Sequence, residues 1–335
     1  MKKILIVAPA WIGDAIMAQP LYRHLHERWP GLTLDVLAPG WTRAVHARMP
    51  EVNETLDNPF GHGELGLGKR WALGRELKRR GYDQAIVLPN SLKSALVPWF
   101  AGIPVRTGWV GEMRHGLLND ARKLDRDALP MMVERFAALA NDRNQPLARP
   151  VPYPRLVIDP AAREAALRKM GLNVDRPVIA LCPGAEYGPA KRWPARHMAA
   201  LASELLAEGK QVWLFGSGKD NEIAGEISAL APGVTNLSGQ TSLAEAIDLL
   251  SYASAVVTND SGLMHVAAAL ERPIAAIYGS SSPRFTPPLT NRAKIVTLSL
   301  ECSPCFERVC PLGHMKCLNE LRPEQVLAAL DELIE

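Results

Sequence analysis

An aspartate stands in the turn that follows the first apolar run of the chain. Residues 8–15 read Ala-Pro-Ala-Trp-Ile-Gly-Asp-Ala, so Gly13 permits a tight turn directly before Asp14. A carboxylate is stabilised at a helix N-terminus, and helix capping alone would explain this one. If it faces a cleft at the end of a strand, it could instead deprotonate a hydroxyl group. Both interpretations stay open, and we take Asp14 as the candidate general base, with Trp11 and Gly13 on the acceptor side.

A glycine-rich segment with adjacent cations follows an apolar run in the second half. Residues 182–194 read Cys-Pro-Gly-Ala-Glu-Tyr-Gly-Pro-Ala-Lys-Arg-Trp-Pro. Glycines leave backbone amides accessible, and such amides together with a lysine can bind a diphosphate. A purely structural turn would not require two cations beside two glycines, although surface cations are common. The segment therefore predicts a phosphate-binding loop that includes Gly184, Ala185, Glu186 and Lys191.

A second polar turn has similar chemistry. Residues 259–265 read Asn-Asp-Ser-Gly-Leu-Met-His and follow another apolar run. A helix that begins here would offer free amides to a phosphate. A capping turn followed by a buried histidine also explains the pattern. Because several loops carry the same phosphate chemistry, we expect Asp260, Ser261, Gly262 and His265 to line a donor site.

Two further glycine patterns carry less information. Gly216-Ser217-Gly218 follows a strand candidate, but Asn221 replaces the third glycine of a dinucleotide-binding fingerprint. Glu222, the next residue, could contact a ribose hydroxyl or simply favour the helix dipole.

The second pattern, Gly63-x4-Gly68-Lys69, resembles a phosphate-binding P-loop. Arg70, however, stands where Ser or Thr would hold magnesium, and no apolar strand precedes the pattern. We interpret it as a flexible loop, with Lys69 near the acceptor.

Four of the five cysteines lie close together near the C-terminus. Their pattern is Cys302-x2-Cys305-x4-Cys310-x6-Cys317, with His314 inside it. Four thiols at short spacing could bind zinc, but the two pairs are closer than in ordinary zinc ribbons. A compact loop with packed thiols or an adventitious disulfide is the favoured alternative. We predict no catalytic metal, and a structural zinc stays open.

The composition is that of an ordinary globular protein. The chain has 335 residues, a net charge of +3 and no apolar run long enough to span a bilayer. An odd cysteine number and a polar break after the first apolar run favour the cytoplasm over export. Residues 1–150 hold 21 Lys/Arg against 15 Asp/Glu, which suits an acidic substrate, an anionic membrane surface or merely solvated helices. No nucleic-acid-binding motif accompanies this charge.

Short apolar runs alternate with amphipathic stretches, which predicts an α/β fold of two doubly wound domains. Five prolines in 144–160 favour an extended linker, so we divide the chain into 1–155 and 156–335 and expect ligands in a cleft between them. The final helix is left open to pack on either domain. The predicted strands are 4–8, 33–38, 84–88, 178–181, 211–215, 255–258, 274–278 and 293–298. The predicted helices are 14–29, 41–47, 69–80, 92–101, 131–139, 160–169, 194–208, 221–230, 243–251, 264–270 and 323–334.

The Gly13-Asp14 turn, the long motif of residues 183–194 and the turn 259–265 together resemble glycosyltransferase family 9, over the full length of the chain. The family contains the lipopolysaccharide heptosyltransferases. The resemblance implies a GT-B fold of two Rossmann-like domains, an N-terminal acceptor domain and a C-terminal nucleotide-sugar domain. It also implies inverting transfer from ADP-heptose to the first heptose of the inner core on Kdo2-lipid A, without metal or cofactor. A phosphorylated lipid acceptor would bring the enzyme into peripheral contact with the cytoplasmic face of the inner membrane.

By the same resemblance, Asp14 is the general base, and Lys191 with the amides near Ala185 and Glu186 holds the diphosphate. Glu222 contacts the ribose, Thr241 lies by the adenine, and residues 260–265 line the donor site. Type I heptosyltransferases carry paired threonines near positions 185 and 186, and their absence here favours the type II subgroup. The alternatives are a GT-B transferase for a UDP- or GDP-sugar and a nucleotide-binding module without catalysis. The oligomeric state is not predicted.

Overall fold

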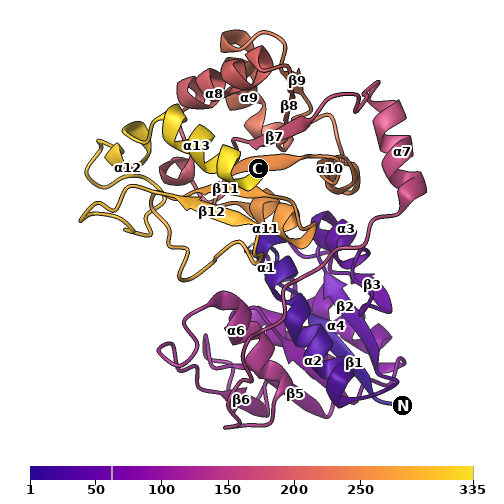
Figure 1. The fold of residues 1–335 in the computed structure, drawn as a ribbon. Helices are drawn as coiled ribbons and strands as arrows, with labels where there is room; N and C mark the ends of the chain where they lie inside the picture. The colour runs from indigo at the N-terminus through magenta and orange to yellow at the C-terminus, as the bar shows by residue number, and fades with distance from the viewer. Residues whose placement is uncertain (62, 335) are drawn as a thin grey trace. The chain divides into compact units, whose positions relative to one another are not determined.

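The structure is a computed structural model that describes residues 1–61 and 63–334. The chain forms two compact units, Met1–Pro154 and Arg155–Glu335 (Figure 1). Each unit contains one sheet of six parallel strands flanked by helices, as the alternation of apolar and amphipathic stretches predicted.

The sheet of the first unit has the order β3-β2-β1-β4-β5-β6. Its centre is β1, which is buried along nearly its whole length and pairs with β2 on one side and β4 on the other. Buried parallel strands must be apolar on both faces, which explains the continuous Ile-Leu-Ile-Val run near the N-terminus. The strands are β1 (Lys3–Val7), β2 (Thr33–Ala38), β3 (Glu54–Asp57), β4 (Gln84–Val87), β5 (Val105–Trp109) and β6 (Asp120–Arg122).

The predicted helix over 14–29 is wrong in one respect, because two helices occupy this stretch. α1 (Ile12–Met17) ends before Ala18, and α2 (Gln19–Arg28) begins with Pro20 in its first turn. Proline has no N–H to donate to the preceding turn, so the continuous helix is interrupted there. The other helices of this unit are α3 (Arg43–His46), α4 (Leu67–Lys78), α5 (Leu96–Phe100) and α6 (Met132–Ala137).

The sheet of the second unit has the order β12-β11-β10-β7-β8-β9. Numbered from its own first strand, this is the order of the first sheet, so both units are doubly wound in the same way. The strands are β7 (Val178–Cys182), β8 (Gln211–Leu214), β9 (Thr235–Asn236), β10 (Ala255–Asn259), β11 (Ile274–Ile277) and β12 (Ala293–Val296).

Helices α8, α9, α12 and α13 of the second unit share one apolar core with its sheet. Met198, Leu201 and Leu205 of α8 pack in this core with side chains from the other three. The last helix, whose place the sequence left open, contacts α8, β10, β11 and β12 (Figure 1). The helices of this unit are α7 (Pro160–Lys169), α8 (Ala195–Ala207), α9 (Asn221–Leu230), α10 (Leu243–Leu250), α11 (Gly262–Ala269), α12 (Lys316–Asn319) and α13 (Pro323–Ile334).

Four strands were not predicted from the sequence: β3, β5, β6 and β9. Each lies at or next to a sheet edge, where one flank of the strand is less buried. β3 has the sequence Glu-Thr-Leu-Asp with one buried residue, and β9 has two residues. Such segments do not require a continuous apolar run, so the pattern that identifies central strands is absent.

Within the described residues, no helix combines the length and apolar character needed to cross a membrane.

The packing of α4 against α5 predicts opposite effects for two glycines of α4. A Cβ at Gly74 would lie 2.5 Å from the Cβ of Phe100, whereas a Cβ at Gly68 would meet no atom within 4 Å. We expect Gly74→Ala to lower the free energy of unfolding by about 1–3 kcal/mol, because the two helices must separate. Gly68→Ala should leave it unchanged or raise it by about 0.5–1 kcal/mol. Urea unfolding followed by circular dichroism measures both, and equal effects would contradict the packing described.

Candidate active site

The two loops predicted to bind phosphate follow neighbouring strands in the middle of the second sheet. β7 and β10 pair in parallel, with Cys182 opposite Thr258 near their carboxyl ends. From β7 the sheet extends to β8 and β9 on one side and from β10 to β11 and β12 on the other, so the winding reverses between them. Doubly wound sheets bind ligands at this switch point. The fold thus brings residues 183–194 and 260–265 to one edge.

A buried amide fixes these loops to each other. The Asn259 side chain is fully buried, and its Nδ2 donates to the carbonyl oxygen of Pro183 at 2.7 Å. Its Oδ1 accepts from the backbone N–H of Trp193 at 3.1 Å. One side chain thereby holds both ends of the loop that follows β7. Asn259 was quoted in the motif but not singled out, because an amide next to a strand carries no positional signal in sequence.

The predicted cation and carboxylate of the two loops form an ion pair. Lys191 Nζ lies 2.5 Å from Asp260 Oδ2, and the side chains are 16% and 5% exposed. The ammonium also lies 4.9 Å from the centre of the Tyr187 ring, a cation–π contact. Lys191 is therefore a positive charge held in a fixed place near the helix start that follows β10.

His265 lies one turn into α11 and is 4% exposed. Burial lowers the pKa of His265 to about 4, the Asp260 carboxylate opposes this shift, and Lys191 adds to it. The imidazole is therefore neutral at pH 7, and its Nδ1 has no hydrogen-bond partner among the described residues. A buried polar atom of this kind can be satisfied by a ligand.

The start of α11 leaves backbone donors available. Ser261 occupies the N-cap position in an extended conformation, and no side chain caps the helix. Gly262 is the first helical residue, so the amides of this turn suit an anion. The structure places Ser261 and Gly262 at the sheet edge that carries Asp260 and His265.

A close side-chain contact accounts for the glycine at position 184. A Cβ there would lie 2.5 Å from Oδ1 of Asp220, in the loop after β8. Asp220 accepts hydrogen bonds from the N–H and hydroxyl of Ser217, each at 2.8 Å. Asp220 was missed by the sequence analysis, since only the fold brings it to Gly184.

The remaining donor-side predictions lie on the loops around this edge. Ala185 is buried, and its carbonyl oxygen accepts from Arg192 Nε at 3.3 Å. Glu186 is exposed and pairs with Lys219 at 2.5 Å, which links the loops after β7 and β8. Glu222 is exposed in the first turn of α9, and the half-buried Thr241 precedes α10. The contacts of these four residues neither support nor contradict the ligand contacts predicted for them.

Two serines beyond the predicted set lie after the neighbouring strand β11. Ser280 and Ser281 are 2% and 7% exposed, and neither hydroxyl has a partner among the described residues. No sequence pattern marks them, because isolated serines after a strand are common.

In the first unit, Asp14 lies after β1, beside the switch point between β1 and β4. The structure corrects one expectation: Trp11, not Asp14, is the N-cap residue of α1, and Asp14 is the third helical residue. Asp14 is half-buried, Gly13 is buried, and Trp11 is 45% exposed. Capping in the strict sense does not explain this aspartate, although the helix dipole still favours its carboxylate.

Lys69 lies in the first turn of α4 and pairs with Glu64 at 3.2 Å. The neighbouring Arg70 is buried, donates to the carbonyl oxygens of Leu65 and Glu64, and stacks on Phe60. Gly68 belongs to α4, so the predicted loop is shorter than expected and Arg70 ties it to the helix.

Comparisons with known proteins agree with these features. Residues 70–316 match the profile of glycosyltransferase family 9 (heptosyltransferase). Lipopolysaccharide heptosyltransferase 2 of Escherichia coli K12 is 49% identical and aligns over 99% of this chain and 98% of its own length. Lipooligosaccharide heptosyltransferase 2 of Haemophilus influenzae is 46% identical over 99% of each chain.

A solved structure extends the likeness to three dimensions. The structure of E. coli ADP-heptose lps heptosyltransferase II superposes with a TM-score of 0.90 and 47% identity, over 100% of this chain and 98% of that one. The expected GT-B class, with two parallel doubly wound sheets, is thus confirmed. By sequence and by fold, the chain belongs to glycosyltransferase family 9, the heptosyltransferase family.

Proposed function

We propose that this chain transfers L-glycero-D-manno-heptose from ADP-heptose to the first heptose of the lipopolysaccharide inner core on Kdo2-lipid A. The observation that carries the proposal is the largely buried Lys191–Asp260 pair, with side chains 16% and 5% exposed, beside the uncapped start of α11. A fixed cation and free helix amides suit a nucleoside diphosphate. The donor and acceptor identities are supported by the likeness to E. coli ADP-heptose lps heptosyltransferase II and to the lipopolysaccharide heptosyltransferase 2 of the same organism.

The reaction is a single displacement. The acceptor hydroxyl loses its proton to Asp14 and attacks the anomeric carbon as the bond to ADP breaks, which inverts that carbon. The departing diphosphate gains negative charge, and Lys191 with the amides of Gly262 and its neighbours stabilises it. Asp260 keeps the ammonium in place, and the neutral His265 can hydrogen-bond without adding charge. In this scheme Gly184 and Ala185 lie along the diphosphate, Glu222 contacts the ribose and Thr241 the adenine.

The nucleotide is tested by calorimetric titration with ADP, UDP and GDP. Preference for ADP supports the proposal, and preference for UDP or GDP would replace it with a transferase for another sugar. Transfer is tested with ADP-heptose and mono-heptosylated Kdo2-lipid A, where the product gains the mass of one heptose. ADP binding without any transfer would instead favour a nucleotide-binding module.

We further propose that the enzyme works in the cytoplasm, in peripheral contact with anionic lipid. The excess of Lys and Arg in residues 1–150 supports this. Binding to vesicles that contain anionic lipid should weaken as salt rises. Equal binding to neutral and anionic vesicles would contradict an electrostatic contact.

Asp14→Asn separates catalysis from donor binding. The amide cannot accept the proton, so turnover should fall by about 10²–10⁴-fold, while ADP affinity measured by calorimetry stays unchanged. Asp57→Asn, an exposed carboxylate at the end of β3, serves as the matched control with normal turnover. Full turnover in Asp14→Asn would exclude this residue as the base.

Lys191→Gln tests the diphosphate site. Loss of a charge-assisted hydrogen bond should weaken ADP binding by about 10- to 100-fold. Because this variant leaves Asp260 buried without its cation, the double variant with Asp260→Asn separates that cost from the lost phosphate contact. Lys210→Gln, which removes a lysine that pairs with the nearby Glu208, is the control. Unchanged ADP affinity in Lys191→Gln would remove this lysine from the donor site.

A further inference from the structure

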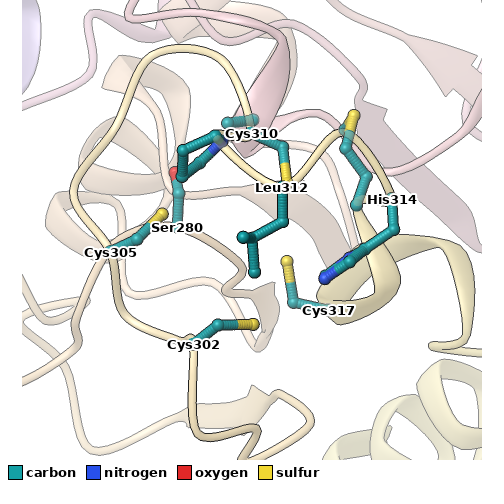
Figure 2. A pocket seen from close by; sticks show the side chains of 10 residues that line it. Ser280, Cys302, Cys305, Cys310, Leu312, His314 and Cys317 are labelled. Carbon is teal, nitrogen blue, oxygen red and sulfur yellow. The ribbon is translucent and has the colours of Figure 1, made fainter.

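Four cysteines line one small cavity in the second unit. Its volume is about 20 Å³, which is enough for one small ion or one water molecule. Figure 2 shows the cysteines around the same space as Ser280, Leu312 and His314.

The thiols are unbridged and close enough to affect one another. All four are free, so the disulfide considered from sequence is not formed. Cys302, Cys305 and Cys310 lie near enough to Cys317 to interact with it electrostatically. Four thiolates around one cavity would repel one another, and a bound cation would remove that repulsion.

Backbone N–H groups surround the sulfur of Cys310. The N–H groups of Met315, Leu312, Gly313 and His314 are directed at this sulfur. Gly313 and Met315 adopt left-handed conformations, with φ of 70° and 45°, which turn the chain around this sulfur. Amide donors that surround a thiolate are a common support for a metal ligand.

An unsatisfied polar group also lies at this cavity. The Ser280 side chain is 2% exposed, lines the cavity, and its hydroxyl has no partner among the described residues. Buried hydroxyl groups are normally hydrogen-bonded, so this one indicates a missing partner in the cavity. A thiolate bound to a metal can accept such a hydrogen bond.

His314 is better suited to donate a hydrogen bond than to bind a metal. Its Nδ1 accepts a hydrogen bond from the backbone N–H of Lys316 at 3.0 Å. A neutral imidazole whose Nδ1 accepts carries its proton on Nε2, and neither nitrogen is then free as a ligand. The four sulfurs are therefore the chemically consistent ligand set.

We propose that Cys302, Cys305, Cys310 and Cys317 bind one Zn²⁺ as a structural, tetrahedral thiolate site. Binding releases the thiol protons to solvent and involves no change in oxidation state. In the described part of the chain, no three Cys, His, Asp or Glu side chains are already arranged to hold an ion, so the thiols must rotate to meet it.

The zinc site would stabilise the loop that contains Lys191. Ala190 lines the cavity, and its N–H donates to the carbonyl oxygen of Arg308 at 3.1 Å. The Tyr187 hydroxyl donates to the carbonyl oxygen of Phe306 at 2.5 Å, and its ring contacts the Lys191 ammonium. The segment between Cys305 and Cys310 thus holds the proposed phosphate-binding loop in place through these hydrogen bonds. This consequence, unlike metal binding itself, rests on the proposed donor site.

Metal analysis of the full chain, purified without oxidation, tests the site directly. We expect about one zinc per chain, and replacement by Co²⁺ should give the absorption of a tetrahedral cobalt–thiolate site. Less than about 0.1 zinc per chain after incubation with excess zinc and removal of the unbound ion would overturn the proposal. So would iron in place of zinc, or a cobalt spectrum without thiolate bands.

Cys305→Ser and Cys310→Ser should each reduce zinc content at least about tenfold. Cys182→Ala, at the end of β7 and outside the cavity, is the matched control with full zinc content. In folded variants, the KM for ADP-heptose should rise about tenfold, with the acceptor KM unchanged. Wild-type zinc content in both serine variants would overturn the ligand assignment. If the enzyme binds zinc but does not use ADP-heptose, only the proposed function fails.

Discussion

One buried amide holds together the two polar loops at the middle of the second sheet. Asn259 ends β10, yet both hydrogen bonds of its side chain go to the loop after β7. Because both partners are backbone groups, the side chain fixes the path of that loop whatever its other residues are. The ammonium of Lys191 and the carboxylate of Asp260 meet only if this path is kept. The paired charges thus depend on a neutral group that itself performs no chemistry.

The doubly wound sheet is the second feature that brings these polar residues together. Chain segments that lie far apart in sequence end at the same edge because parallel strands present their carboxyl ends together. Burial then makes the chemistry specific: His265 stays neutral and Asp260 stays paired, because little water reaches either. The same topology in the first unit places Asp14 after its central strand, which is why both units supply polar turns at equivalent points of their sheets.

The sequence was most informative where burial is continuous. Central strands such as β1 and β7 follow directly from their apolar runs. The loop at 183–194 was marked by glycines beside cations, and the turn at 259–265 by polar residues at the start of a helix. Edge strands such as β3 lack that run and were missed. Asp220 and Ser280 were missed for a different reason. Asp220 contacts Gly184 and Ser280 lies beside the four cysteines, and a single sequence does not show which distant residues are close in the fold. The break at Pro20 was readable from proline chemistry and was overlooked.

The contact between Gly184 and Asp220 limits how this protein can vary. The space that any larger side chain at position 184 would need is occupied by a carboxylate that also ties down Ser217. A larger residue at 184 therefore displaces the Asp220 carboxylate, which breaks its hydrogen bonds to Ser217 and releases the loop after β8. Any redesign of position 184 has to treat that loop as part of the same change.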